Sequence, residues 1–328
     1  MRAHPLRLST ALVASALIAT VLVTAVGASP ASAAGSVKVS NNTTIRCGFV
    51  NYSTPTDWYI PSTGTPKGLV WLQHGFTENK GNWADYGPKL AAAGYVAVAT
   101  TLPTADLFGC TVQNIGNNTG YLNNIATVFG QAATGSGALV SSYNDATRRA
   151  GRSGLGFPAR WSFVGHSAGG EAVAYVAQRL RTNHAPAFAR LGGLVLEDPV
   201  ASFIGSNLSS ALSGLNTTTL PIYALASPPY SCNTNQSGTL LVEQRLTTRT
   251  FHGAQITSGS HGDVFGSAVG AIETATCGTP QAKNVAAVQA LSTAWLTDQI
   301  AGTTTAANYP GGASYQPLVS AGTIATLP

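Results

Sequence analysis

Short apolar runs alternate with stretches of helical periodicity along most of the chain, and this alternation restricts the fold more than any other sequence feature. Gly68–Gln73 and Tyr95–Thr100 are brief apolar runs bounded by turn residues, as buried strands are. Glu171–Arg181 instead repeats its apolar side chains every three or four residues, as a helix does. The alternation predicts an α/β protein with a mostly parallel central sheet and helices on both faces. In such sheets, functional groups gather at the carboxyl ends of the strands.

The other elements follow from the same patterns. The further expected strands are Asp57–Ile60, Trp161–Val164, Leu194–Leu196, Ile222–Ala226 and Thr250–Ile256. The expected helices are Trp83–Ala93, Tyr121–Gln131, Ala138–Arg149, Leu240–Leu246 and Asn284–Ile300. We predict no strand in the Thr- and Asn-rich stretch up to about residue 45, and extended coil after Ile300. No internal repeat or long linker divides residues 34–328, which we expect to form one domain.

The charge content excludes several classes of protein. Only 9% of the residues are charged, while 44% are hydrophobic, the reverse of a disordered chain. A coiled coil would need many more Glu and Lys residues. The 17 basic and 12 acidic residues give a net charge of +5, but no five basic residues cluster. We therefore expect no nucleic-acid partner.

The N-terminus has the three-part pattern of a secretory signal peptide. Arg2 and Arg7 precede the uncharged, mostly apolar run Thr10–Val26, and small residues follow up to Ala33. A transmembrane anchor is the alternative, but a run of 17 residues interrupted by polar side chains is marginal for spanning a bilayer. We predict that residues 1–33 are removed and that the protein is secreted, without a stable membrane anchor.

The predicted export bears on whether the four cysteines form disulfides. An even number of cysteines in a secreted chain predicts disulfides. Four cysteines allow three connectivities, of which we favour Cys47–Cys110 and Cys232–Cys277 because each pair lies within one half of the chain. None of the four has a Cys or His partner at the short spacing of a metal site.

The most specific motif is Gly165–Gly170, with the sequence Gly-His-Ser-Ala-Gly-Gly. It lies between an expected strand and an expected helix, which is the setting of a nucleophile elbow. The glycines permit a sharp turn that exposes the hydroxyl of Ser167 above the sheet, at the positive end of the helix dipole. A glycine-rich structural turn is the alternative reading. We predict that Ser167 is a nucleophile.

A nucleophilic serine needs a base, and three histidines follow Ser167 in the chain. His184 follows a helix and is expected on the surface. His252 falls within a predicted strand, so it should point to a face of the sheet. His261 lies in the flexible loop Ser258–Asp263 beyond that strand, from which its ring can reach the serine. We predict His261 as the base.

The acid follows by elimination. Four carboxylates lie between the serine and the predicted base: Glu171, Glu197, Asp198 and Glu243. The first begins the elbow helix and the last lies in a helix with polar neighbours. Glu197 and Asp198 both follow the strand Gly193–Leu196, and Asp198 precedes Pro199, which ends the strand. We predict Asp198 as the acid, with Glu197 as the alternative.

An oxyanion generated at the serine needs two backbone N–H donors. The first expected donor is Ala168, the residue after the nucleophile. The second should come from the loop after an early strand, where Gly75 permits a turn and Phe76 supplies the N–H. His74 in this loop precedes the elbow in the chain, so we expect it to pack or position the loop rather than to take part in catalysis.

These motifs resemble those of a known superfamily. Gln73–Thr77, the Trp83–Val96 segment with its Gly-Pro-Lys-Leu and Gly-Tyr-Val sequences, and Gly165–Gly170 are similar to segments of α/β-hydrolases. Within that superfamily the sequence resembles chlorophyllase-like esterases and secreted cutinase-like polyester hydrolases of the PET-hydrolase type. The resemblance covers roughly residues 65–300 and implies the α/β-hydrolase fold and a Ser-His-Asp triad.

The two families differ in where the acid lies. Leu196–Val200, with the sequence Leu-Glu-Asp-Pro-Val, is similar to the Asp-Pro-Val segment that carries the chlorophyllase acid. Polyester hydrolases have their acid after the next strand, where this chain has Ala226–Ser231 without a carboxylate. The resemblance thus also favours Asp198, whereas secretion and disulfides resemble the polyester hydrolases.

The sequence therefore predicts a secreted serine carboxylic-ester hydrolase. Its partner would be an ester substrate, a small molecule, a lipid or a polyester, and we expect a monomer that needs no metal or organic cofactor. Leu102–Pro158 and Pro228–Ser237 are expected to shape the substrate pocket. An acyltransferase or a peptidase would use the same groups, and a catalytically silent binding protein on the same scaffold is the alternative from another class.

Overall fold

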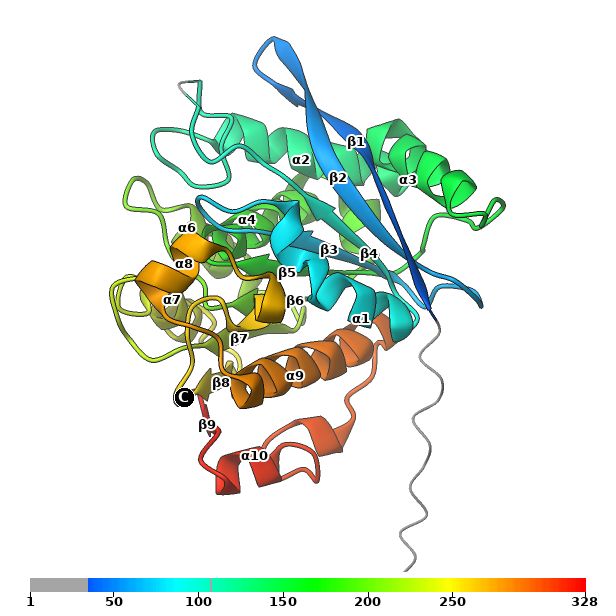
Figure 1. Ribbon diagram of the computed structural model, residues 1–328. Helices are drawn as coiled ribbons and strands as arrows, with labels where there is room; N and C mark the ends of the chain where they lie inside the picture. The colour runs from blue at the N-terminus through cyan, green and yellow to red at the C-terminus, as the bar shows by residue number, and fades with distance from the viewer. Residues whose placement is uncertain (1–34, 107) are drawn as a thin grey trace, which may run out of the picture. The chain divides into compact units, whose positions relative to one another are not determined.

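A nine-stranded sheet organises the chain (Figure 1), in the order β1-β2-β4-β3-β5-β6-β7-β8-β9. The computed structural model describes residues 35–106 and 108–328, so the predicted signal peptide lies outside the described residues. The strands are β1 Ser36–Cys47, β2 Val50–Pro61, β3 Leu69–Gln73, β4 Val96–Thr100, β5 Trp161–His166, β6 Leu191–Glu197, β7 Ile222–Ala226, β8 Gly253–Ile256 and β9 Ile324–Thr326.

The centre of the sheet is parallel and its edges are antiparallel. Strands β3 to β8 pair in parallel, while β1, β2 and β9 pair antiparallel with their neighbours. Every residue of β3, β4, β5 and β6 is buried. Strands covered on both faces need continuous apolar runs, which explains why these strands are readable in the sequence. The predicted α/β class with a mostly parallel sheet is confirmed.

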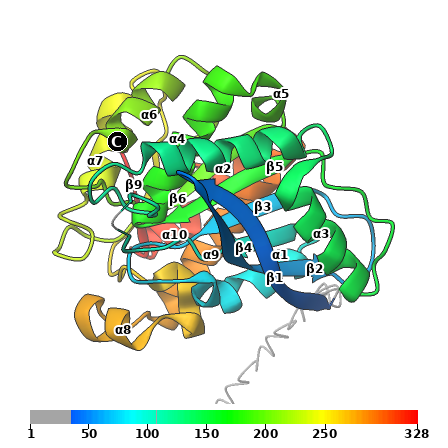
Figure 2. The same ribbon diagram turned by 90° about the horizontal axis from the view of Figure 1, so that it is seen from above.

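Helices cover both faces of the sheet (Figure 2). The α-helices are α1 Tyr86–Ala92, α2 Thr119–Ala132, α3 Gly137–Arg149, α4 Ala168–Asn183, α5 Ala185–Phe188, α6 Asn207–Leu215, α7 Ser237–Arg245, α8 Ala271–Cys277, α9 Ala282–Ala301 and α10 Gln316–Ser320, and the 3₁₀ helices are η1 Lys80–Ala84, η2 Asp263–Ala268 and η3 Ala306–Asn308. One core joins α2, α3, α4 and α6 to the sheet, and a second joins α1 and α9 to its opposite face.

Neighbouring strand residues divide between the two cores. Trp71 packs with α2 and α4, whereas Val70 and Leu72 pack with α1 and α9. This follows from the pleat, because successive side chains of a strand point to opposite faces. The cores meet only through the sheet, so the strand ends are held from both sides.

The first strand was not predicted. The Thr- and Asn-rich stretch expected to carry no strand contains β1, which pairs with β2 along its whole length. Its buried positions alternate with exposed ones and include Val39, Thr43, Ile45 and Cys47. An edge strand with a polar outer face and a threonine on its inner face shows little apolar character, so the prediction was wrong.

The C-terminal tail is also more regular than predicted. The segment expected as extended coil contains η3, α10 and β9, and β9 pairs antiparallel with β8. Ile324 in β9 and Tyr315 before α10 are buried against the core of α1 and α9. A strand of three residues carries too short a pattern to be recognised locally, because its pairing depends on a partner far away in the chain.

Two disulfides tie loops to this framework. Cys47 at the end of β1 is bonded to Cys110, and Cys232 after β7 is bonded to Cys277 at the end of α8. These are the two pairings favoured from the sequence. Within residues 35–106 and 108–328, no helix combines the length and hydropathy that crossing a bilayer requires.

Candidate active site

The register of three parallel strands brings the predicted site residues to one edge of the sheet. Gln73 of β3 pairs with Gly165 of β5, and His166 of β5 pairs with Glu197 of β6. The loop after β3 therefore begins beside the turn after β5. Ser167 directly follows the end of β5 and Asp198 directly follows the end of β6, so the two residues leave adjacent strand ends. Parallel pairing makes these neighbours although the chain separates them.

The turn at Ser167 has the conformation of an elbow. Ser167 has φ 55° and ψ −124°, a backbone conformation that non-glycine residues rarely adopt, and α4 begins at the next residue. A Cβ at Gly75 would lie 2.6 Å from Ser167 Cβ, and a Cβ at Gly169 would lie 2.4 Å from the carbonyl oxygen of Gln73. Only glycine fits both positions, because the loop after β3 touches the elbow there.

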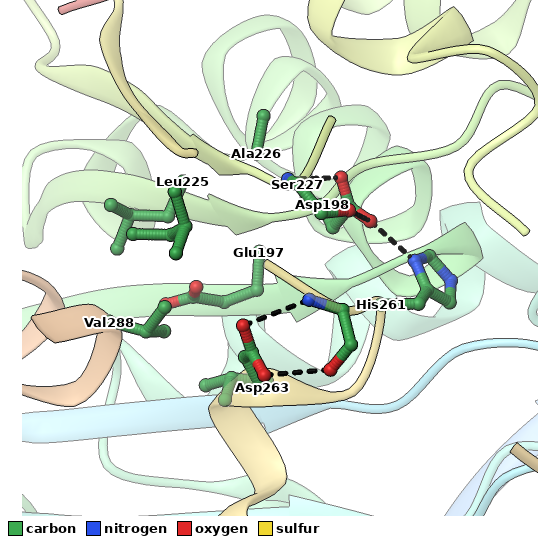
Figure 3. A pocket seen from close by; sticks show the side chains of 11 residues that line it. Glu197, Asp198, Leu225, Ala226, Ser227, His261, Asp263 and Val288 are labelled. Atoms are coloured by element: carbon green, nitrogen blue, oxygen red, sulfur yellow. Dashed lines mark hydrogen bonds and ion pairs between the residues drawn. The ribbon is translucent and has the colours of Figure 1, made fainter. Parts of the chain in front are cut away.

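Asp198 and His261 form a buried hydrogen-bonded pair (Figure 3). Asp198 Oδ2 lies 2.6 Å from His261 Nδ1. Asp198 also accepts hydrogen bonds from Ser227, through its backbone N–H at 2.9 Å and its hydroxyl, and from Asn233 Nδ2 at 3.2 Å. Burial alone would raise the pKa of Asp198, but the bonds from His261 and Ser227 outweigh it and hold that pKa below its usual range.

The pair fixes the tautomer of the His261 ring. An ionised carboxylate only accepts hydrogen bonds, so Nδ1 of His261 carries a hydrogen, and in the neutral ring Nε2 has the lone pair. An imidazole in this tautomer can accept a proton from a hydroxyl. Among the hydrogen bonds of the described residues, none joins Ser167 Oγ to the His261 ring, and the elbow is instead linked to His261 through His166, whose Nε2 is 2.8 Å from the His261 carbonyl oxygen.

The other histidines considered as the base lie elsewhere. His252 precedes β8 instead of lying within it, and its buried ring contacts the carbonyl oxygens of Leu246 and Pro328. His184 is the residue between α4 and α5, packed against Gly130. Neither ring makes a hydrogen bond to Asp198.

The other carboxylates also have different surroundings. Glu171 accepts hydrogen bonds from the backbone N–H and hydroxyl of Ser202, and Glu243 is half-buried in α7. Glu197 is buried and points away from His261 toward Val288 (Figure 3). Burial raises the pKa of Glu197 to about 8. This carboxyl is therefore neutral at pH 7, unlike Asp198.

The loop after β3 is anchored by His74. This residue is fully buried, with Nδ1 2.7 Å from the Gly75 carbonyl oxygen and Nε2 accepting the Leu102 N–H at 3.0 Å. A carbonyl only accepts, so Nδ1 donates and the ring is neutral. Burial lowers the pKa of His74 to about 4, in agreement with that assignment. His74 thus positions the loop, as expected from its place before the elbow.

No protein-family model and no curated protein sequence matches this chain. A solved structure does match: brefeldin A esterase, described as a bacterial homologue of human hormone-sensitive lipase, with a TM-score of 0.51. The match covers 83% of this chain and 79% of that protein. The chain has the α/β-hydrolase fold. At 10% sequence identity, the likeness is one of fold.

An open groove lies over Ser167 in this α/β-hydrolase fold. It has a volume of about 420 Å³ and is lined mainly by apolar side chains and by small polar ones. The lining residues Gln113–Ile115, and Ser231, Cys232 and Thr234, come from the two segments predicted to shape the pocket. Phe203 and Ile204, in the loop after β6, are 81% and 49% exposed and were not predicted. Nothing in the sequence distinguishes this loop from an ordinary surface turn.

The sequence analysis also missed a second buried group. Glu78 in the loop after β3, His166 and Glu273 in α8 lie together beneath His261. Single ring nitrogens of His166 and His261 and an oxygen of Glu273 lie within 4.8 Å of one another, as ligands of a metal ion could. However, His166 Nε2 faces a carbonyl oxygen, so it carries a hydrogen and has no lone pair to offer a metal.

Proposed function

We propose that this protein is a serine carboxylic-ester hydrolase in which Ser167, His261 and Asp198 form the catalytic triad. The observation that carries the proposal is the 2.6 Å contact between Asp198 and His261, formed at the strand end next to the elbow serine. Neither residue is near the serine in sequence. Their meeting beside a strained nucleophile turn is what acyl transfer by a triad requires.

The proposed reaction has two halves. His261 Nε2 takes the proton of Ser167 Oγ as that oxygen attacks the ester carbonyl, and His261 then gives the proton to the departing alcohol. Water attacks the acyl-enzyme in the same way and releases the acid. Asp198 keeps His261 in the required tautomer and stabilises the imidazolium. None of these steps calls for a metal or an organic cofactor.

The oxyanion is proposed to bind the N–H groups of Phe76 and Ala168. Ala168 is the first residue of α4, so its N–H has no partner within the helix. In the loop after β3, the Gly75 N–H is already bonded to Glu78 at 2.6 Å. The next N–H along the chain is that of Phe76, whose 44% exposed ring borders the groove.

The substrate is proposed to be an ester with an apolar acyl or alcohol part. The exposed Phe203, Ile204 and Ile115 along the groove support this class, because they would be covered by such a group. The position of Asp198 supports the chlorophyllase-like resemblance more than the polyester-hydrolase one. We further propose that the protein is a secreted monomer without its residues 1–33, and the two disulfides support export.

Labelling with a fluorophosphonate tests the proposal. We expect the purified protein to be labelled at Ser167 and to hydrolyse p-nitrophenyl esters, with kcat/KM rising as the acyl chain grows long enough to fill the groove. A polyester film and a phytyl ester, tested beside this series, separate polymer from lipid-like substrates. Absence of both labelling and hydrolysis would contradict the proposal and favour a silent binding protein.

A further inference from the structure

Three buried polar side chains outside the proposed triad lie between the loops that carry it. Glu78 lies in the loop after β3, which also carries the proposed oxyanion donor. His166 precedes the nucleophile, and Glu273 lies in α8 against Gly262, next to His261. The side chains of Glu78 and Glu273 are 7% and 9% exposed, and that of His166 is fully buried. Buried ionisable groups are costly to fold, so their presence at this place calls for a role.

Hydrogen bonds connect the loop after β3 to the loop of His261 through Glu78 and His166. Glu78 Oε2 accepts the Gly75 N–H at 2.6 Å and is joined to His166 Nδ1 at 3.0 Å. The other ring nitrogen of His166 donates to the His261 carbonyl oxygen at 2.8 Å. The backbone on both sides of the proposed reaction centre is therefore held by one histidine and one carboxyl.

Glu273 lies beside this pair without a hydrogen bond to it. Its Oε1 is 3.9 Å from His166 Nε2, and neither of its buried carboxyl oxygens has a hydrogen-bond partner among the described residues. Burial and the neighbouring Glu78 raise the pKa of Glu273 to about 8, so its carboxyl is neutral at pH 7. Glu273 therefore takes no part in the hydrogen-bonded connection.

We propose that Glu78 and His166 are positioning residues, which hold the loop after β3 and the loop of His261 in register with the elbow. The inference rests on the proposed function, which it deepens by adding the group that aligns the two sides of the site. Gly75 is the residue before the proposed donor Phe76, and the bonded carbonyl belongs to His261 itself. A small shift at either end would misplace a reacting group.

Substitutions at Glu78 and His166 separate positioning from folding. Glu78→Leu removes the oxygen that accepts the Gly75 N–H and contacts His166, whereas Glu78→Gln keeps an amide oxygen that can accept the Gly75 N–H. His166→Leu removes the hydrogen bond to the His261 carbonyl oxygen. Glu243→Gln, in α7 outside the group, is the matched control.

The measurement is kcat per active site, with active sites counted by fluorophosphonate labelling of the full secreted protein. We expect Glu78→Leu and His166→Leu to lower kcat per labelled site at least tenfold while KM changes less than threefold. Glu78→Gln should recover most of the loss caused by Glu78→Leu, and Glu243→Gln should stay within twofold of wild type. A merely structural role would reduce the number of labelled sites and leave kcat per site unchanged.

The outcomes distinguish this inference from the proposed function. Wild-type labelling with kcat per site within twofold in both Glu78→Leu and His166→Leu overturns the inference alone. Equal losses in Glu78→Leu and Glu78→Gln overturn it as well, because the hydrogen bond to the Gly75 N–H would then not matter. If Glu78→Leu does not fold, Glu78→Gln and His166→Leu decide. Failure of the wild type to be labelled overturns the proposed function and the inference together.

Discussion

Asp198 Oδ2 lies 2.6 Å from His261 Nδ1, although 63 residues of chain separate the two. Asp198 follows the last residue of β6, and His261 lies in the loop after β8, two strands away. β7 lies between them and ends in Ala226, so Ser227 is placed where it can bond to Asp198 from the side. The pair is thus set by three parallel strands ending at the same level.

The nucleophile assignment leads to the first prediction. Ser167→Ala should lower ester hydrolysis by about 10⁴-fold or more, because no other hydroxyl is placed on the elbow. Its thermal unfolding should stay close to that of the wild type, since alanine removes only an oxygen. Steady-state kinetics and circular dichroism melting measure the two effects. Residual activity near that of the wild type would contradict the assignment.

The acid assignment can be tested without changing shape. Asp198→Asn should lower kcat by roughly 10⁴-fold, because an amide favours the wrong imidazole tautomer and does not stabilise the imidazolium. Glu243→Gln should stay within about tenfold of the wild type. If Asp198→Asn keeps most of its rate in the same assay, the enzyme does not depend on this acid.

The bond from Ser227 to Asp198 is expected to contribute to the rate. Ser227→Ala removes the hydroxyl that donates to Oδ2 while keeping the backbone N–H bond to Oδ1. A lost hydrogen bond to a charged group typically costs about 1.5–3 kcal/mol, so kcat should fall about tenfold or more. Ser213→Ala, exposed in α6, is the control. Equal rates for the two variants would mean that Ser227 is dispensable.

The buried Glu197 should make stability depend on pH. Its folded pKa of about 8 exceeds the unfolded value of about 4.3, so between these pH values the native state binds the extra proton. Its stabilising contribution is therefore complete below pH 4.3 and is lost as the pH rises to about 8. Glu273 titrates over the same range.

Glu197→Gln removes one of these two titrations. Relative to the wild type, its free energy of unfolding should increase by about 1–4 kcal/mol between pH 5 and pH 8. Urea unfolding at both pH values measures this change. The variant should also keep its activity within about tenfold, because Glu197 points away from His261. If the free energy of unfolding changed equally with pH in the wild type and in Glu197→Gln, Glu197 would be ionised in the folded state.

The two disulfides should differ in their effect on activity. Cys232→Ser with Cys277→Ser opens a loop of 45 residues and should cost up to about 4 kcal/mol of stability. It also frees the end of α8, which packs against Gly262 next to His261, so kcat should fall about tenfold. Cys47→Ser with Cys110→Ser should lower the melting temperature but leave kcat within about twofold. Similar kcat values for the two double variants would show that α8 does not influence the site.

Elements whose pattern is local could be predicted from the sequence alone. Buried strands such as β4 and β7 appear as uninterrupted apolar runs because both faces are covered, and the elbow is readable because its turn demands glycine. Elimination among four carboxylates led to Asp198, since only two of them follow a strand end. The edge strands β1 and β9 were missed because their pairing partners, and not their own residues, define them.

Which distant side chains meet depends on the tertiary structure. Glu78 and His166 are 88 positions apart, and their contact exists because β3 and β5 pair in parallel and end side by side. The same holds for Ser227 and Asn233, which bond to Asp198 from a turn with no carboxylate of its own. Local spacing encodes the turn and the strand, whereas hydrogen bonds between loops depend on strand order and register, which the whole chain sets.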